Sequence, residues 1–457
     1  MCIDFLNNWT TTNNNFPLTD SNIEKWISVV PTNSQLRFAQ KPFNVFIHFG
    51  MNTSTGREWG NGKETVEDFT ISHINVHQWV EVIKKSGATG IILTCKHHDG
   101  FCLWDTQYTD FKITNTVYKK DLVKELSVCC AENGIDFGVY LSPWDMHEKS
   151  YATPKYNDYF INQLTELLSN YGRIFEVWFD GAKGADAKEF DYDWQRYYKL
   201  IYSLQPDANI SICGPDIRWV GNEAGKTRKS EFCVVPEYLR MAETVQKKSQ
   251  HTEADAEELQ QLKSTDEDLG SRDVLKKSSE ICWYPAEVDV SIRKGWFHRD
   301  SEDDTVKSAD VLFYIYLNSI GNNCALLLNV PPSKNGIIEK PDADSLNLLG
   351  DKIKSITEHP ILTDNHGELT QGFLEYTFNQ CRTVNYCILR EDIKKSQRIE
   401  LFDVYAKDEN GEFKEVFHGT VIGQRRIIPL RLKTDKIIIV IRQSRSTPFL
   451  EEVSFYG

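Results

Sequence analysis

The sequence predicts a (β/α)8-like (TIM-type) barrel followed by a C-terminal β-sandwich, and two patterns support this prediction. Over roughly the first 350 residues, short and almost wholly apolar strand segments alternate with segments of helical periodicity, which is typical of a parallel sheet covered by helices. From residue 357 onward, short strands of alternating polarity are separated by turn residues at intervals of roughly ten residues, as in a β-sandwich. We therefore expect one domain over residues 1–356 and a second over residues 357–457.

The expected barrel strands are the most apolar segments of the first domain. They lie at 43–49, 88–95, 135–141, 173–179, 208–213, 281–292 and 324–330. The expected helices lie at 74–87, 120–133, 158–172, 192–206, 307–323 and 346–356. Repetition of this unit over such a length favours a barrel. A doubly wound sheet has the same local pattern and remains an alternative, because the strands after residue 213 are harder to count.

Residues 226–280 differ from the rest of the first domain. They are rich in Lys, Glu, Gln and Ser, and their centre reads EADAEELQQLKSTDEDLGSRDVLKK. A charge run of this kind is usually a solvated face. We expect a charged helical insertion or a mobile loop at this point of the barrel.

The composition argues against several classes of partner. The chain has 52 basic and 66 acidic residues and a formal net charge of −14, whereas a nucleic acid would require a basic surface. The sequence contains no run of about 18 apolar residues, so no membrane span is predicted. The N-terminal MCIDFLNNWTTTNNNF lacks the basic and apolar regions of a signal peptide, so we expect a cytoplasmic protein, or a secreted or periplasmic one whose signal peptide has been removed. The 11 cysteines have no CxxC spacing and are expected to be buried free thiols.

Polar and aromatic side chains follow the predicted strands at the ends where a barrel carries its reactive groups. In a (β/α)8 barrel the C-terminal ends of all strands meet at one rim. The residues at these ends include His48, His97, His98, Tyr140, Trp178, Asp180, Arg218, Trp219 and Glu223. This concentration predicts a binding or catalytic site at the rim.

Three kinds of chemistry compete for these residues. A metal site is disfavoured because the chain has neither HxH nor HExxH, and the adjacent His97 and His98 could face one point only where the chain bends. Histidines that merely form structural hydrogen bonds are a second interpretation, and Asp180 alone could be a helix N-cap. A carboxylate pair formed by Asp180 and Glu223 is the third, and it is what glycoside hydrolysis requires: one carboxylate attacks the anomeric carbon and a protonated partner assists the leaving oxygen. Burial near aromatic rings would raise the partner's pKa as needed.

Taken together, several stretches resemble the α-L-fucosidases of glycoside hydrolase family 29. They are FNVFIHFGMNTSTGREWG (43–60), TCKHHDGFCLW (94–104), FGVYLSPWD (137–145), EVWFDGAKG (176–184), RWVGNEAG (218–225), WYPAEVDVSIRKGWF (283–297) and NCALLLNVPPSKNG (323–336). The resemblance implies a retaining hydrolase of fucosylated oligosaccharides or glycoconjugates that needs no metal or organic cofactor. Asp180, in WFDG, matches the nucleophile that forms the covalent fucosyl-enzyme intermediate.

The resemblance also assigns the sugar-binding residues. The candidates that match or lie beside the family's fucose-binding residues are His48, Glu58, Trp59, His97, His98, Tyr140, Trp178 and Trp296. Trp178 flanks the nucleophile, and Trp296 is expected to form a wall for the C5 methyl group. A fucose-binding lectin or an inactive homologue on the same scaffold is the alternative.

The acid/base has two candidates. Glu223 lies in RWVGNE, which looks like the acid/base stretch of the branch that prefers α-1,3 and α-1,4 linkages, such as those of Lewis antigens. Glu287, in PAEVDVSIR, is the rival, and it could instead orient Arg293 or contact the substrate. We expect Glu223 to be the acid/base and the substrate to be a branched, fucosylated glycan.

Overall fold

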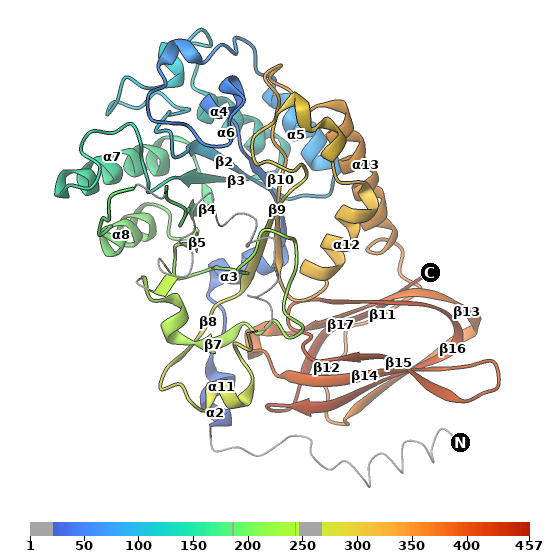
Figure 1. Ribbon diagram of the computed structural model, residues 1–457. Helices are drawn as coiled ribbons and strands as arrows, with labels where there is room; N and C mark the ends of the chain where they lie inside the picture. The colour runs from blue at the N-terminus through green and yellow to red at the C-terminus, as the bar shows by residue number, and fades with distance from the viewer. Residues whose placement is uncertain (1–21, 185–186, 243, 246–266) are drawn as a thin grey trace.

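The structure is a computed structural model, and it describes residues 22–184, 187–242, 244–245 and 267–457 (Figure 1). Eight parallel strands form one sheet in the order β5–β4–β3–β2–β1–β10–β9–β6. They are β1 (Phe43–Ile47), β2 (Gly90–Lys96), β3 (Asp136–Leu141), β4 (Ile174–Phe179), β5 (Asn209–Ile212), β6 (Arg218–Trp219), β9 (Ala286–Ser291) and β10 (Ala325–Asn329). A bridge between Ser211 and Ile217 brings the two edges together, so the barrel is nearly closed. The predicted barrel is confirmed. The doubly wound alternative is wrong, because the described strands follow one another around the barrel in chain order.

Each barrel strand has two buried faces, which explains the almost continuous apolar runs. In β1, Val45 and Ile47 belong to the large core between the strands and the helices, whereas Phe46 points into the barrel. There Phe46 packs with Tyr140 of β3 and Trp178 of β4. The inner layer therefore places an aromatic floor beneath the C-terminal rim.

Helices cover the outside of the barrel (Figure 1). They are α5 (Val76–Lys85), α6 (Leu122–Asn133), α7 (Pro154–Asn170), α8 (Trp194–Leu204), α12 (Ala309–Ser319) and α13 (Lys340–Ser355). Asn75, Asp121 and Asp193 cap α5, α6 and α8 with side-chain oxygens, which satisfies backbone N–H groups that lack an intrahelical partner. Helix α13 begins at Lys340 rather than at residue 346, because its first turn is polar and gives no apolar periodicity.

The segment expected as one strand, 281–292, is two strands. Strand β8 (Ile281–Trp283) pairs antiparallel with β7 (Val234–Pro236) outside the barrel, and only β9 enters it. Pro285 lies between β8 and β9 and has no N–H group to donate to a ladder. Strand β6 has two residues and gave no separate strand signal, because its segment contains too few apolar residues.

The C-terminal part is the predicted β-sandwich. Its strands are β11 (Leu362–Asp364), β12 (Gly367–Glu368), β13 (Phe373–Glu391), β14 (Ile399–Lys407), β15 (Phe413–Gly419), β16 (Arg426–Ser444) and β17 (Phe449–Tyr456). The order is β11–β17–β13–β16–β14–β15, all antiparallel, around a separate apolar core. In the sequence, β13 and β16 each look like two separate short strands. The pairing register between these two long strands shifts between Thr377 and Arg382 of β13. Such irregularities bend long strands.

The charged segment 226–280 lies partly outside the described residues, because residues 243 and 246–266 belong to the undescribed part. The described residues on either side form β7, the 3-10 helix Glu237–Arg240 and the short helix α11 (Arg272–Leu275). They lie beside the sandwich, where Val421 packs with Phe232 and Val235. Helix α13 ends at Ser355 and β11 begins at Leu362, and we propose 356/357 as the domain boundary.

Two other predictions concern the chain as a whole. Across the described ranges, no helix combines the length and apolar character needed to cross a membrane. Among the ten cysteines of the described part, all are free thiols; Cys381 is exposed and the others are buried. The prediction of buried thiols is therefore confirmed for all but Cys381.

Candidate active site

A cavity opens at the C-terminal rim of the barrel. All strands are parallel, so the residues that follow them reach the same end. The cavity is lined by Phe46, His48, Glu58, Trp59, His97, His98, Trp178, Asp180, Gly181, Ala182, Ile212, Trp219, Glu223, Asp289 and Trp296. Most of the residues predicted for the site are therefore brought together, and both proposed catalytic carboxylates face the same space.

Asp180 directly follows β4 and is held by groups on three sides. The hydroxyl of Tyr140 donates to Oδ2 at 2.9 Å, and Nε2 of His98 lies 3.7 Å from the same oxygen. The backbone N–H of Ala182 donates to Oδ1 at 2.8 Å. The next helix, α8, is capped by Asp193 instead, so Asp180 is not its N-cap. Burial, together with the neighbouring Asp180, raises the pKa of Tyr140 well above its ordinary value, which keeps this hydroxyl a donor.

The imidazole of His48 is neutral and has a fixed orientation. Its Nδ1 lies 2.8 Å from Oδ1 of Asn329. The amide of Asn329 donates to Ser291 Oγ and to the carbonyl of Trp296, so its oxygen is left to accept from Nδ1–H of His48. Burial lowers the pKa of His48 to about 4, and the hydrogen bond to Asn329 only partly offsets this effect. Nε2 then remains an acceptor for a hydroxyl group.

His97 and His98 both line the cavity because β2 ends at Lys96, before either of them. Their ring centres are 4.1 Å apart. Burial and the neighbouring imidazoles lower the pKa of His97 well below its ordinary value. Donor atoms of His97, His98 and Asp180 lie within 4.8 Å of one another, a spacing that a cation could use, although Oδ2 of Asp180 already accepts from Tyr140.

Glu58 and Trp59 enter from the loop after α4 (Met51–Thr55). Glu58 Oε1 accepts from the backbone N–H of Trp296 at 2.5 Å, and Oε2 lies 3.0 Å from the guanidinium of Arg299. Burial raises the pKa of Glu58, and these two groups partly offset the effect. The ring of Trp59 lies 5.1 Å from that of His98. Glu58 thus joins two loops of the rim.

Glu223 lies in the loop after β6. The indole N–H of Trp296 donates to its Oε2 at 3.3 Å, and the ring of Trp296 packs 5.1 Å from that of His48. Trp296 is therefore in contact with both His48 and the candidate acid/base.

Two predicted residues lie behind the cavity wall. Tyr140 reaches the cavity only through its contact with Asp180, and Glu287 is fully buried inside the barrel. The indole N–H of Trp178 donates to Oε1 of Glu287 at 3.0 Å. Burial and the carboxyl group of Glu176 raise the pKa of Glu287 well above its ordinary value, and burial raises that of Glu176 to about 8. Glu287 is thus a neutral group beneath Trp178 and does not line the cavity.

The sequence-based assignment missed Asp289, and it placed Trp219 at the rim without giving it a role. Asp289 lines the cavity and accepts from the indole N–H of Trp219 at 2.7 Å. Burial raises the pKa of Asp289 to about 8, and Glu287 contributes to the rise. A signal was present: successive strand residues face opposite sides, so Glu287 and Asp289 both point inward while Val288 points to the helices. The other unassigned lining residues are Phe46, Gly181, Ala182 and Ile212.

A barrel rim whose cavity is lined by several carboxyl groups, among them Asp180 and Glu223, offers the carboxyl pair that glycoside hydrolysis requires. The family model described as alpha-L-fucosidase matches residues 12–358. The chain therefore belongs to the α-L-fucosidase family and is an enzyme of that family.

Individual relatives agree with this assignment. The chain is 34% identical over 466 residues to alpha-L-fucosidase 1 of Arabidopsis thaliana, covering 93% of this chain and 87% of the relative. A crystal structure of a glycoside hydrolase 29 family member from an unknown rumen bacterium is 34% identical, with a TM-score of 0.80 over 94% of this chain and 77% of that chain. A Ruminococcus gnavus fucosidase of family 29 in complex with fucose is 26% identical, with a TM-score of 0.79 over 94% and 95% of the two chains.

Proposed function

We propose that this enzyme is a retaining exo-glycosidase that hydrolyses terminal α-L-fucose from branched glycans through a covalent fucosyl-enzyme intermediate. The observation that carries the proposal is the shared cavity of Asp180 and Glu223. The similar Ruminococcus gnavus fucosidase, which was crystallised with fucose, supports fucose as the sugar bound here.

In the first step Asp180 attacks the anomeric carbon while protonated Glu223 donates its proton to the leaving oxygen. In the second step Glu223 removes a proton from a water molecule, and the resulting hydroxide displaces Asp180. The hydrogen bonds from Tyr140 and Ala182 hold both carboxylate oxygens of Asp180 before attack. This pre-orientation lowers the entropic cost of the reaction.

The remaining cavity residues suit a neutral deoxysugar. Neutral His48 can accept a hydrogen bond from a hydroxyl group through Nε2, and neutral His97 likewise places no net charge in the cavity. Trp296, which the resemblance assigns to the C5 methyl group, supplies an apolar surface. Glu58 can accept hydrogen bonds from sugar hydroxyl groups. Asp289 and Trp219 extend the wall toward the loop of Glu223.

The linkage preference that we propose is α-1,3 and α-1,4. Its support is the stretch RWVGNEAG, which carries both Trp219 and Glu223. Trp219 ends β6, Glu223 lies in the loop that follows, and both line the cavity. The groups that meet the aglycone would therefore belong to the same segment as the acid/base.

The test is a panel of fucosylated oligosaccharides, with and without EDTA, in which free L-fucose is measured. We expect release from a Lewis trisaccharide to exceed release from a 2-fucosylated lactose by at least about tenfold, which corresponds to about 1.4 kcal/mol of transition-state binding. Comparable rates would contradict the linkage preference. Binding without fucose release would favour the lectin alternative, and loss of activity with EDTA would favour a metal-dependent hydrolase.

A further inference from the structure

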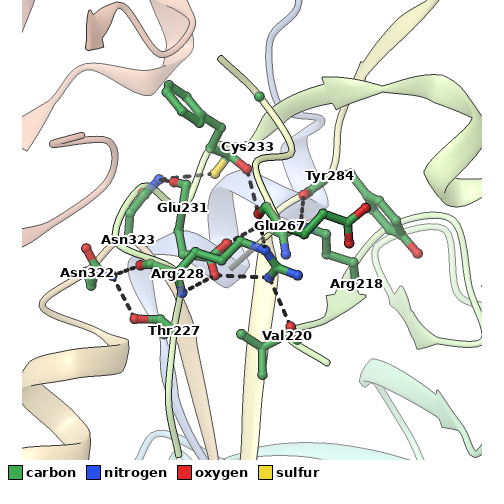
Figure 2. Close-up of polar contacts among 12 residues, drawn as sticks. Arg218, Val220, Thr227, Arg228, Glu231, Cys233, Glu267, Tyr284, Asn322 and Asn323 are labelled. Carbon is green, nitrogen blue, oxygen red and sulfur yellow. Dashed lines mark hydrogen bonds and ion pairs between the residues drawn. The ribbon is translucent and has the colours of Figure 1, made fainter. Parts of the chain in front are cut away.

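The loop that carries Glu223 is bracketed by two arginines. Arg218 lies in β6, just before the loop, and Arg228 lies just after it. Both side chains turn to one carboxylate, that of Glu231 (Figure 2). None of the three lines the cavity, so this cluster belongs to the support of the site rather than to its surface.

The cluster is a buried double ion pair. Arg218 Nη2 donates to Oε2 of Glu231 at 2.5 Å, and Arg228 donates to Oε1 from its backbone N–H at 2.9 Å and from Nη1 at 3.2 Å. The side chains of Arg218, Arg228 and Glu231 are 7%, 7% and 1% exposed. Burial alone would raise the pKa of Glu231, but the two guanidinium groups outweigh burial and lower it.

The same cluster closes the base of the loop. Arg228 Nη1 also donates to the carbonyl of Val220 at 2.9 Å, which joins the end of the loop to its start. Inside the loop, Asn222 accepts from the N–H of Ala224 at 3.1 Å and donates to the carbonyl of Lys226 at 3.1 Å. The loop therefore has an internally fixed shape. The ion pairs attach it to the barrel together with two further hydrogen bonds, from the N–H of Val220 to the carbonyl of Glu287 and from the hydroxyl of Thr227 to the carbonyl of Asn318.

Backbone contacts fix the far side of the cluster. Asn322 and Asn323, which follow α12, donate to the carbonyls of Arg228 and Glu231 at 2.7 and 2.8 Å. Arg218 also donates from Nε to the carbonyl of Tyr284 at 3.1 Å. Glu231 is thus anchored to two other parts of the barrel, and the loop is held in relation to them.

We propose that Glu231 is a positioning residue that aims Glu223 at the leaving oxygen. This inference rests on the proposed role of Glu223 as the acid/base. A proton donor must lie within hydrogen-bond distance of the atom it protonates, and a misplacement of about 1 Å can cost about 100-fold in rate. A looser loop therefore weakens proton donation while Asp180, on the opposite support, keeps its orientation.

The experiment compares two aryl α-L-fucosides of similar size, one with a phenol leaving group and one with 2,4-dinitrophenol, which needs little protonation. In Glu231→Gln we expect kcat/KM to fall about 10- to 100-fold for the phenyl fucoside. For the dinitrophenyl fucoside we expect a fall of no more than about threefold, because the general acid contributes little to that step.

Glu400→Gln is the matched control. Glu400 also joins two arginines, accepting from Arg272 Nε at 2.7 Å and from Arg445 Nε at 2.9 Å, but it lies in β14 of the sandwich. Its loss should lower the melting temperature without changing the ratio between the two substrates. If Glu231→Gln does not fold, Arg228→Lys, which keeps a charge but not the simultaneous bonds to Val220 and Glu231, serves as the second variant.

Equal losses on both substrates in the folded variants would overturn the inference and leave Glu231 a stabilising residue only. Glu223→Gln separates this failure from a failure of the proposed function. If Glu223→Gln shows the leaving-group dependence and Glu231→Gln does not, only the positioning role is wrong. If Glu223→Gln lacks it too, Glu223 is not the acid/base.

Discussion

Buried acidic groups lie beneath both sides of the cavity, and the cost of burying their charge is avoided on one side and compensated on the other. Beneath Asp180, Glu176 and Glu287 face each other inside the barrel, and among the described residues neither has a Lys or Arg partner. Their pKa values are raised, so the pair keeps protons. Beneath the Glu223 loop, Glu231 lies between two guanidinium groups and has a lowered pKa. One support is held neutral and the other is held charged, although burial is nearly complete in both.

The difference matches how each of the two proposed catalytic groups is attached to the barrel. Asp180 follows a barrel strand immediately, so the strand fixes its position and a neutral interior is sufficient below it. Glu223 lies on a loop that includes Gly221 and Gly225 at φ of 104° and 72°, which is backbone that most residues avoid. Such a loop needs side-chain anchors, and charged hydrogen bonds are the strong and directional ones.

The largest expected effect separates the two carboxylates themselves. Asp180→Gly should lower kcat by roughly 10⁴- to 10⁶-fold, as does loss of other catalytic nucleophiles. With azide it should form β-L-fucosyl azide, because azide then attacks from the side of the missing carboxylate. Glu223→Ala should lose about 10²- to 10⁴-fold on poor leaving groups and should form α-L-fucosyl azide from the covalent intermediate. Azide products of the same anomeric configuration in both variants would contradict this division of roles.

A smaller effect tests the orientation of the nucleophile. Tyr140→Phe removes the hydroxyl donor to Asp180, a hydrogen bond to a charged group that is worth about 1.5–3 kcal/mol. We expect kcat/KM to fall about 10- to 100-fold, by the same factor for good and poor leaving groups, unlike the Glu231 variant. Tyr198→Phe is the control, since its buried hydroxyl donates to the carbonyl of Cys213. A leaving-group dependence in Tyr140→Phe would show that Tyr140 acts on the acid/base instead.

The last expected effect is on stability rather than on rate, and its sign differs between the two supports. The folded Glu176 and Glu287 pair keeps protons that the unfolded chain releases above pH 4.5. The contribution of this pair to wild-type stability therefore falls as pH rises toward about 8, by about 1.4 kcal/mol per pH unit for each proton. Glu287→Gln removes one of these protons, so its melting temperature should rise relative to that of wild type as pH increases.

Glu231→Gln should behave in the opposite way. The pKa of Glu231 is lower in the folded state, so its stabilisation is present above pH 4.5 and is lost as pH falls through the folded pKa. The variant should lose about 3–5 kcal/mol at neutral pH and should approach wild type under acidic conditions. Melting temperatures measured from pH 8 down to well below pH 4.5 test both signs, and parallel curves for the two variants would refute the contrast.

Local patterns were sufficient for much of the fold and of the rim. Apolar strands and polar strand ends placed His48 and Asp180 correctly, because in a parallel barrel the position of a residue along its strand sets the rim it reaches. Short or interrupted elements were not predictable in this way. Strand β6 has two residues, β8 leaves the barrel at Pro285, and β13 joins two segments that look separate. Their pairing depends on partners that are distant in the chain.

The sequence by itself determined the class of fold, the family and the residues that follow the barrel strands, because these depend on periodicity and on position within a motif. Only the tertiary structure decided which acids line the cavity and which are buried behind it. Glu287 and Asp289 lie two residues apart on one strand face, yet only Asp289 lines the cavity. The charge of a buried carboxyl group depends on whether a guanidinium group or another carboxyl group lies next to it. The fold determines which of these groups is the neighbour.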